Sequence, residues 1–318
     1  MLAFAAKLAG VSVVLGALMF FATAAPLPAD GRTPAQFADG DGPAPRPALP
    51  LTPATELLFR AFEDVRHDEF ATLNPAISAL LEQQPEARIG VALRWSNGET
   101  LFMRNAREPF PLASVAKVYM LVAYLDRLQR EHRGPDEDEV EILSSMIDVS
   151  DNDSAEEIWA SLGGIEGMQQ YLSRIGMEPL TQAPPAGDGG DDDPEAWGDA
   201  GQSAAQMSLF LARLWQRELL DREYTQLARW FLGGVVEEQS WGVPTNVAEL
   251  DPVAKVLFKN GWYPTDDGYW RINSAGIVVP GQGEPYVLVL FGDGFESWSQ
   301  GIEAVNTVAA MINGILLD

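Results

Sequence analysis

The stretch from Leu112 to Leu125 has the sequence LASVAKVYMLVAYL, which is apolar except for Ser114 and Lys117. A helix that is apolar on every side is a buried helix. Burying an ammonium group is costly unless the group is paired or gives up its proton, and a desolvated lysine can act as a base. Ser114 lies three residues before Lys117 and therefore on the same helix face, where such a lysine activates a hydroxyl as a nucleophile. The stretch predicts a buried helix that begins with a serine–lysine pair.

Composition excludes several classes of protein. The chain has 318 residues, of which 47% are hydrophobic, enough for a large core in one or two domains. It contains no cysteine, which excludes disulfides, thiolate metal sites and a cysteine nucleophile. Its two histidines, His67 and His132, have no candidate nucleophile beside them in sequence, so a serine–histidine triad is not expected. The formal net charge of −25 argues against nucleic acid as a partner, and we expect neither a metal nor a cofactor.

The N-terminal residues 1–25 have the pattern of an export signal. Lys7 precedes a long apolar run that contains an Ala-Thr-Ala cleavage pattern. The run is also close to the length that spans a membrane, so an uncleaved N-terminal membrane anchor is the alternative. Residues 26–53 contain eight prolines, which is typical of a disordered linker. We expect an exported monomer that is periplasmic, extracellular or anchored facing outside, with its folded domain at residues 54–318.

Hydrophobic periodicity along the folded domain predicts one sheet assembled from both ends of the chain. The order is a helix, two strands, a block of helices, three strands and a final helix, at residues 55–73, 88–95, 99–104, 112–125, 137–148, 154–161, 165–175, 202–219, 223–233, 253–262, 269–279, 286–291 and 297–317. A loop rich in Gly, Pro and Asp is predicted at 177–201. We predict an α/β (α+β) fold with an antiparallel sheet of about five strands flanked by helices. An all-helical subdomain is expected at about 113–250.

Three short motifs follow one another along this domain. They are Ser114-Val115-Ala116-Lys117 on the buried helix, Ser150-Asp151-Asn152 before a helix, and Lys259-Asn260-Gly261 on a strand. Their order and context resemble the S-x-x-K, S-D-N and K-T-G motifs of the class A β-lactamases and the penicillin-binding D,D-peptidases. The resemblance covers roughly residues 55–318 and implies a β-lactamase/transpeptidase-like fold.

The resemblance implies a chemical role for the first two motifs. Ser114 attacks a carbonyl carbon and becomes acylated, and Lys117 takes or relays the serine proton. Ser150 passes a proton to the leaving nitrogen, and Asn152 holds Lys117 and the substrate amide. The backbone amides of Ser114 and Trp262 form the oxyanion hole.

The third motif implies a surface that binds the substrate. Lys259 attracts a substrate carboxylate, and Gly261 lets the substrate backbone approach closely. Asn260 stands where the family usually has a threonine or serine hydroxyl, and its amide can donate a hydrogen bond to the same carboxylate. Arg271, on the next strand, either helps to bind that carboxylate or is an ordinary exposed cation.

Each motif also has a local structural interpretation. Ser150-Asp151-Asn152 alone is compatible with a helix N-cap, and Lys259-Asn260-Gly261 alone with the end of a strand. Class A β-lactamases place a water-activating glutamate in an E-x-x-x-N pattern, to which Glu195 and Asp199 are a loose match. Because the surrounding acidic loop is also compatible with a solvated surface segment, acylation is better supported than fast deacylation.

These observations give one functional prediction and two alternatives. We predict an exported serine hydrolase that cleaves a small-molecule β-lactam or a peptidoglycan-type peptide through an acyl-Ser114 intermediate. The first alternative is a D,D-carboxypeptidase, penicillin-binding protein or esterase with slow deacylation. The second is a catalytically inactive binding module associated with the cell wall.

Overall fold

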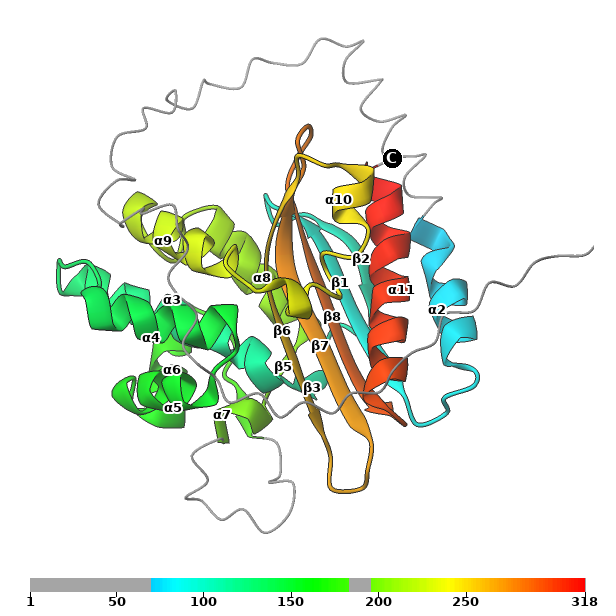
Figure 1. The fold of residues 1–318 in the computed structure, drawn as a ribbon, viewed down its shortest axis with the longest axis horizontal. Coiled ribbons are helices and arrows are strands. Elements are labelled where there is room, and N and C mark those ends of the chain that lie inside the picture. The colour runs from blue at the N-terminus through cyan, green and yellow to red at the C-terminus, as the bar shows by residue number, and fades with distance from the viewer. Residues whose placement is uncertain (1–69, 183–195, 318) are drawn as a thin grey trace, which may run out of the picture. The chain divides into compact units, whose positions relative to one another are not determined.

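Five antiparallel strands drawn from both ends of the chain form the central sheet (Figure 1). The computed structural model describes residues 70–182 and 196–317. Because β1 pairs directly with β8, the first and last parts of the described chain close one sheet, and the predicted antiparallel sheet is confirmed. The strands lie in the order β2-β1-β8-β7-β6, with bounds Arg88–Trp95 for β1, Thr100–Arg104 for β2, Lys255–Pro264 for β6, Trp270–Val279 for β7 and Tyr286–Phe295 for β8.

Both faces of this sheet are buried. In β8, Val287, Val289 and Phe291 pack on one face, whereas Leu288 and Leu290 pack on the other. Side chains alternate between the two faces of a strand, so a strand that is covered on both sides must be apolar throughout. The continuous apolar run in β8 follows from this double burial.

Helices α2 (Leu73–Leu81) and α11 (Trp298–Leu317) lie side by side on one face of the sheet (Figure 1). The sequence analysis did not predict α2, since the N-terminal helix that it expected ended at residue 73. Pro75 lies in the first turn of the helix, where a missing N–H removes no intrahelical hydrogen bond. The helix predicted at 55–73 lies almost entirely outside the described residues.

One buried polar side chain ties α11 to the sheet. Asn313 is fully buried and accepts a hydrogen bond from the Tyr286 hydroxyl at 2.7 Å. Its amide nitrogen donates to the carbonyls of Val243 at 3.0 Å and Thr245 at 2.7 Å. The three bonds join the helix, strand β8 and the segment that precedes β6.

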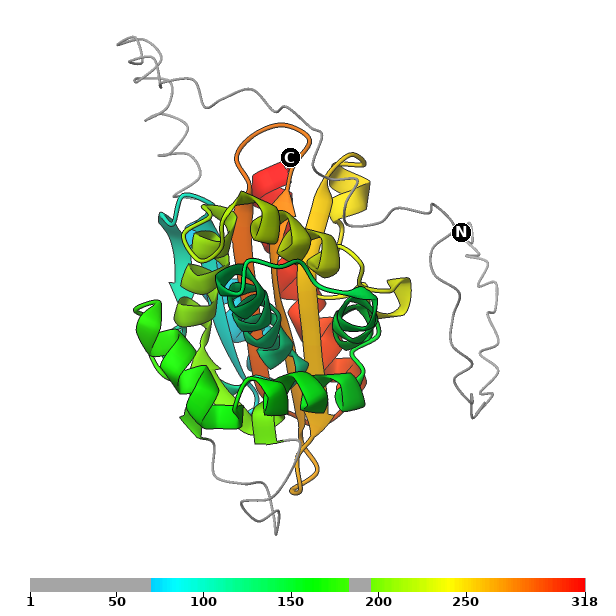
Figure 2. The same ribbon diagram turned by 90° about the vertical axis from the view of Figure 1, so that its left-hand side faces the viewer.

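A block of helices around α3 (Ala116–Arg130) covers the opposite face of the sheet, and Figure 2 views this block with the strands behind it. Every residue of α3 from Ala116 to Asp126 is buried, as its apolar sequence predicts. The other helices of the block are α4 (Glu137–Asp148), α5 (Asn152–Ser161), α6 (Gly164–Arg174), α7 (Ala196–Asp199), α8 (Ala204–Trp215) and α9 (Arg222–Leu232). The short helices η3 (Glu237–Gln239) and α10 (Val247–Leu250) lead back to β6.

The block is not purely helical, in contrast to the prediction for residues 113–250. A small sheet in the order β3-β5-β4 combines Pro109–Pro111, Ala200–Ser203 and Thr181–Gln182. Its strands are only two to four residues long, too short for periodicity to reveal them. Two of them lie in the segment predicted as a loop at 177–201.

Polar N-caps set the starts of several helices. Asp136 and Glu139 form a reciprocal capping box at the start of α4. The Ser203 hydroxyl caps α8, and the Asp221 carboxylate caps α9. Because these residue types are readable in sequence, the predicted helices that became α4 and α9 start within a residue of their observed positions.

The predicted export signal or anchor at residues 1–25 and the predicted linker at 26–53 lie outside the described residues. Within the described part of the chain, none of the helices combines the length and the apolar character that crossing a membrane requires.

We expect Asn313→Ala to lower the free energy of unfolding by about 2–4 kcal/mol, because two carbonyls and one hydroxyl lose a buried partner at once. Chemical denaturation monitored by tryptophan fluorescence measures this change. Glu303→Ala, at an exposed position of the same helix, is the matched control and should leave stability almost unchanged. An equal effect of the two substitutions would contradict the proposed role of Asn313.

Candidate active site

Lys117 lies in the first turn of α3 and is fully buried. Its amine donates to the Asn152 Oδ1 at 2.9 Å and to the backbone carbonyls of Ser150 at 2.7 Å and Asp151 at 3.1 Å. The Ser150 hydroxyl oxygen lies 3.3 Å from the same nitrogen. Since burial removes the water shell of the amine, these oxygens replace that shell.

The loop between α4 and α5 brings those oxygens to the lysine. Ser150 has a φ of 63°, a left-handed conformation that costs a non-glycine residue about 1–3 kcal/mol. The Asp151 carboxylate accepts from the Ser154 amide at 2.7 Å and caps α5. The Ser150-Asp151-Asn152 motif thus caps a helix through the Asp151 side chain, as its local interpretation suggests. The same three residues also accept hydrogen bonds from Lys117.

Ser114 lies in a 3₁₀ turn, Ala113–Val115, just before α3 rather than inside the α-helix. It is partly exposed, and the preceding Ala113 has a φ of 49°, a second strained position beside the site. The side-chain amide of Asn273 donates to the carbonyls of Pro111 at 2.8 Å and Leu112 at 3.1 Å. Strand β7 therefore holds the chain that leads into the turn.

Gly261 lies directly against the backbone of this turn. A Cβ atom at Gly261 would come within 2.7 Å of the Ser114 nitrogen and 2.8 Å of the Val115 nitrogen. Strand β6 is the edge of the sheet, so its backbone is accessible from the side of the turn. Only glycine permits this approach, which brings the first and third motifs together.

Lys259 is fully buried on the same strand, and its amine donates to the Asn260 carbonyl at 3.2 Å. Burial and the nearby charge of Lys117 hold the pKa of Lys259 well below its ordinary value, whereas the Asp148 carboxylate opposes this shift. The site therefore contains two buried amines in electrostatic contact, and each disfavours the protonation of the other.

Asn260 points to the opposite face of β6, since successive side chains alternate. It is fully buried, and its amide nitrogen donates to the carbonyls of Gln239 at 2.7 Å and Trp241 at 2.9 Å. The Trp262 ring packs on the Trp241 ring on that side, with the ring centroids 5.7 Å apart. The predicted contact of the Asn260 side chain with a substrate has no support in this arrangement.

Arg271 is engaged by protein groups. Its guanidinium donates to Asp199 and Asp293, each at 3.4 Å, and to the Tyr263 hydroxyl. Tyr263 in turn donates to Asp199. The side chain is neither the ordinary exposed cation nor a free ligand for a carboxylate, and a substrate contact would require this network to open.

Trp197 and Asp199 both lie in the short helix α7, and Trp197 lies beside Lys117. The Lys117 amine lies 4.7 Å from the centroid of the Trp197 ring, which is almost fully buried. The Asp199 carboxylate is turned toward Tyr263 and Arg271. Glu195 lies outside the described residues.

This geometry agrees with comparisons to known proteins. The model of the β-lactamase enzyme family matches residues 72–140 and 139–316, most of the chain. The chain belongs to the β-lactamase enzyme family. A comparison with curated proteins finds no match.

Solved structures share the fold of this β-lactamase family member. A class A β-lactamase from Bacteroides cellulosilyticus DSM 14838 is 19% identical, with a TM-score of 0.66 over 78% of this chain and 98% of that one. A β-lactamase from Chitinophaga pinensis DSM 2588 is 16% identical, with a TM-score of 0.64 over 77% of this chain and 99% of that one. PBP-A is 20% identical, with a TM-score of 0.62 over 77% of this chain and 96% of that one.

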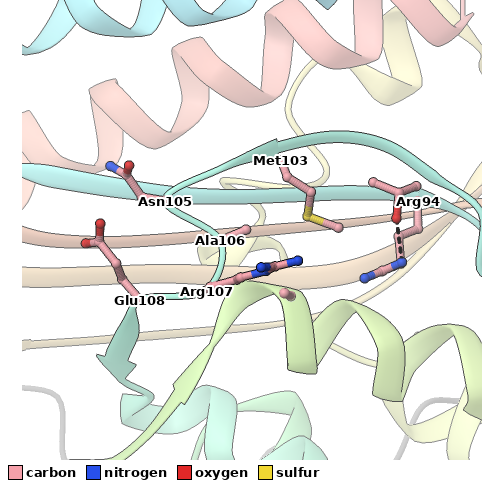
Figure 3. A pocket seen from close by; sticks show the side chains of 8 residues that line it. Arg94, Met103, Asn105, Ala106, Arg107 and Glu108 are labelled. Carbon is pink, nitrogen blue, oxygen red and sulfur yellow. Dashed lines mark hydrogen bonds between the residues drawn. The ribbon is translucent and has the colours of Figure 1, made fainter.

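A separate hollow of about 600 Å³ lies at the other edge of the sheet, beside β2 and the start of α8 (Figure 3). Arg94, Met103 and Arg107 are among the residues that line it. None of the motif residues lines this hollow, so it is not part of the site of this family member.

Three residues of the site were missed by the sequence analysis. Asn273 is a single amide in an apolar strand, a signal that could have been noticed because an unpaired buried amide is costly. Trp197 was hidden in an acidic loop, and Asp148 appeared to be an ordinary helix end. Only the tertiary structure places Asn273 beside the Ser114 turn, Trp197 beside Lys117 and Asp148 near Lys259.

We expect Gly261→Ala to slow the reaction of Ser114 with a serine-reactive fluorophosphonate about a hundredfold, since a displaced strand misaligns the turn. Overpacking should also lower stability by about 1–3 kcal/mol. Labelling rates and thermal melting measure the two effects. Gly134→Ala, where a Cβ meets no atom within 4 Å, is the control. Unchanged labelling of the Gly261 variant would contradict the close approach.

Proposed function

We propose that this protein is an exported serine hydrolase that cleaves a β-lactam or a related amide through an acyl-Ser114 intermediate. The observation that carries the proposal is the position of the Lys117 amine, between Ser150 and Asn152 and one turn after Ser114. Membership of the β-lactamase enzyme family and the shared fold support it. Export rests on the pattern of residues 1–25.

The acylation step uses the chain's own groups. Lys117 takes the proton from the Ser114 hydroxyl, whose oxygen forms a bond to the carbonyl carbon. The backbone amides of Ser114 and Trp262 stabilise the oxyanion, and the contact of Gly261 with the turn supports their approach. Ser150, next to the Lys117 amine, gives its proton to the nitrogen as the C–N bond breaks and takes back the proton that Lys117 removed from Ser114. The product is an ester on Ser114.

Asn152 and Lys259 bind the substrate in this proposal. The Asn152 Oδ1 accepts a hydrogen bond from Lys117. Asn152 is exposed, so its side-chain amide nitrogen can donate to the substrate. Lys259, which is fully buried on strand β6, is the cation that attracts a substrate carboxylate. The substrate lies along the edge strand, whose free backbone groups can pair with it.

Slow release of the acyl group is the second candidate, and one observation favours it. Asp199, which corresponds to the asparagine of the E-x-x-x-N pattern, is held by Tyr263 and Arg271, and the Trp197 ring lies over Lys117. This arrangement leaves Glu195 as the only proposed water-activating base. A variant of PBP-A is known as an acyl-enzyme complex with penicillin G, which is the behaviour expected of a penicillin-binding D,D-peptidase.

We expect a labelled penicillin to modify the wild-type protein covalently and Ser114→Ala to abolish the label. Lys117→Ala should slow labelling about a hundredfold or more, because it removes the general base. Mass spectrometry of the intact protein measures the added mass. Ser173→Ala and Lys255→Ala, at exposed positions, are the matched controls. An unlabelled wild-type protein would exclude acylation by penicillin and favour the inactive binding module.

We expect a chromogenic cephalosporin to give a burst of about one equivalent followed by slow turnover. The reason is that Asp199, in the segment proposed to activate water, is already bound by Tyr263 and Arg271. Stopped-flow absorbance measures the burst and the steady state. Glu195→Gln should change neither, and Glu157→Gln, at an exposed position of α5, is its control. Rapid continuous hydrolysis that is lost in Glu195→Gln would make the protein a β-lactamase in the full sense.

A further inference from the structure

Asp148 ends helix α4 two residues before Ser150, and its carboxyl group packs against Gly234. A Cβ atom at Gly234 would overlap the Asp148 Oδ1. A Cβ atom at Gly233 would lie 3.4 Å from the Leu257 side chain. Leu257 and Lys259 share one face of β6, because side chains two residues apart point the same way. Gly234 thus packs on this carboxyl group, and its neighbour Gly233 lies beside the face of β6 that carries Lys259.

A second connection fixes the same two elements. The Gln239 side chain donates to the Val149 carbonyl at 3.2 Å, and the Asn260 side chain donates to the Gln239 carbonyl at 2.7 Å. Val149 follows Asp148 and Asn260 follows Lys259 in the chain. The Val236 amide also donates to the Asp148 carbonyl at 3.1 Å. Gln239 therefore links the end of α4 to strand β6 at the residues that follow the two charged ones.

Lys259 is fully buried, and a buried cation is strongly disfavoured unless a negative charge lies nearby. Other carboxylates of the packed elements have different roles: Asp151 caps α5, while Glu237 and Glu238 of η3 are exposed. Among the described residues the Asp148 Oδ1 is buried without any hydrogen-bond donor. The Oδ1 atom thus has no hydrogen bond that explains its burial.

We infer that Asp148 is a positioning residue whose carboxylate is the buried counter-ion of Lys259 and keeps that amine charged for recognition of a substrate carboxylate. The substrate part of this inference rests on the proposed function, whereas the counter-ion part does not.

The ionisation of both groups is consistent with this pairing. Burial raises the pKa of Asp148 to about 7, and the charge of Lys259 opposes the rise. Burial and the charge of Lys117 lower the pKa of Lys259, and Asp148 opposes that fall. Lys259 is cationic only below its pKa. Removing the Asp148 charge must lower this pKa further, so the pH range in which Lys259 binds a carboxylate moves to lower pH.

The chain contains only four lysines, Lys7, Lys117, Lys255 and Lys259, which makes their titration directly observable. We would label the full-length protein with [ε-¹³C]lysine, follow the Cε resonances from pH 5 to 11, and assign Lys259 as the signal that is lost in Lys259→Arg. In Asp148→Asn the Lys259 midpoint should fall by about one pH unit or more. Glu141→Gln, at an exposed position of α4, should not move it. An unchanged Lys259 midpoint in Asp148→Asn overturns the inference.

Gly234→Ala provides a second variant in which the charge is kept but the carboxyl group is displaced. It should also lower the Lys259 midpoint, and circular dichroism establishes that both variants are folded. A midpoint that moves in neither variant overturns the counter-ion role.

Acylation kinetics then test the substrate part. In Asp148→Asn, the second-order labelling of Ser114 by penicillin, which bears a carboxylate, should fall about tenfold at pH 7.5 through a higher KM, and recover as the pH is lowered. Labelling by an uncharged fluorophosphonate should be unchanged. Equal losses for both probes overturn the recognition role. Failure of penicillin to label the wild type contradicts the proposed function, while the NMR titration still decides the counter-ion role.

Discussion

The structure of this site depends on the burial of one amine. Lys117 has lost its water shell, and the loop between α4 and α5 must supply oxygen atoms in its place. This requirement explains why Ser150 keeps a left-handed conformation and why Asp151 caps the next helix so close to it. The strain of the loop is balanced by the hydrogen bonds that its oxygens accept from the lysine.

The closure of the sheet from both ends of the chain brings the remaining groups to that amine. Strand β6 comes from the last third of the chain, and Gly261 places its backbone against the turn that carries Ser114. Asn273 of the neighbouring strand holds the approach to the turn. The turn that carries Ser114 and strand β6 therefore depend on the same sheet, which α11 supports from the opposite face through Asn313.

Charge is arranged unevenly in this acidic chain. Two lysines are buried at the site, while most acidic groups near them are exposed or engaged in helix capping. Such an arrangement makes the ionisation of each group depend on the others, because a low-dielectric interior strengthens every interaction. The groups proposed for acylation lie close together, whereas Trp197 packs near Lys117 and Asp199 is bonded to Tyr263.

The sequence by itself determined the buried helix, the five-stranded antiparallel sheet and the three motifs, because burial and pairing leave periodic patterns and because a lone charge in an apolar run is conspicuous. It did not predict α2 as a separate helix, and it failed at the short strands of the small sheet, which are shorter than any usable period. The spacing of the third motif also suggested a substrate contact for Asn260, yet alternation along β6 turns that side chain to the far face. Which residues meet was decided only by the tertiary structure. Asp148, Trp197 and Asn273 are distant in the chain from the groups they contact, and only the packing of α4, α7 and β7 around Lys117, Lys259 and Ser114 brings them into the site.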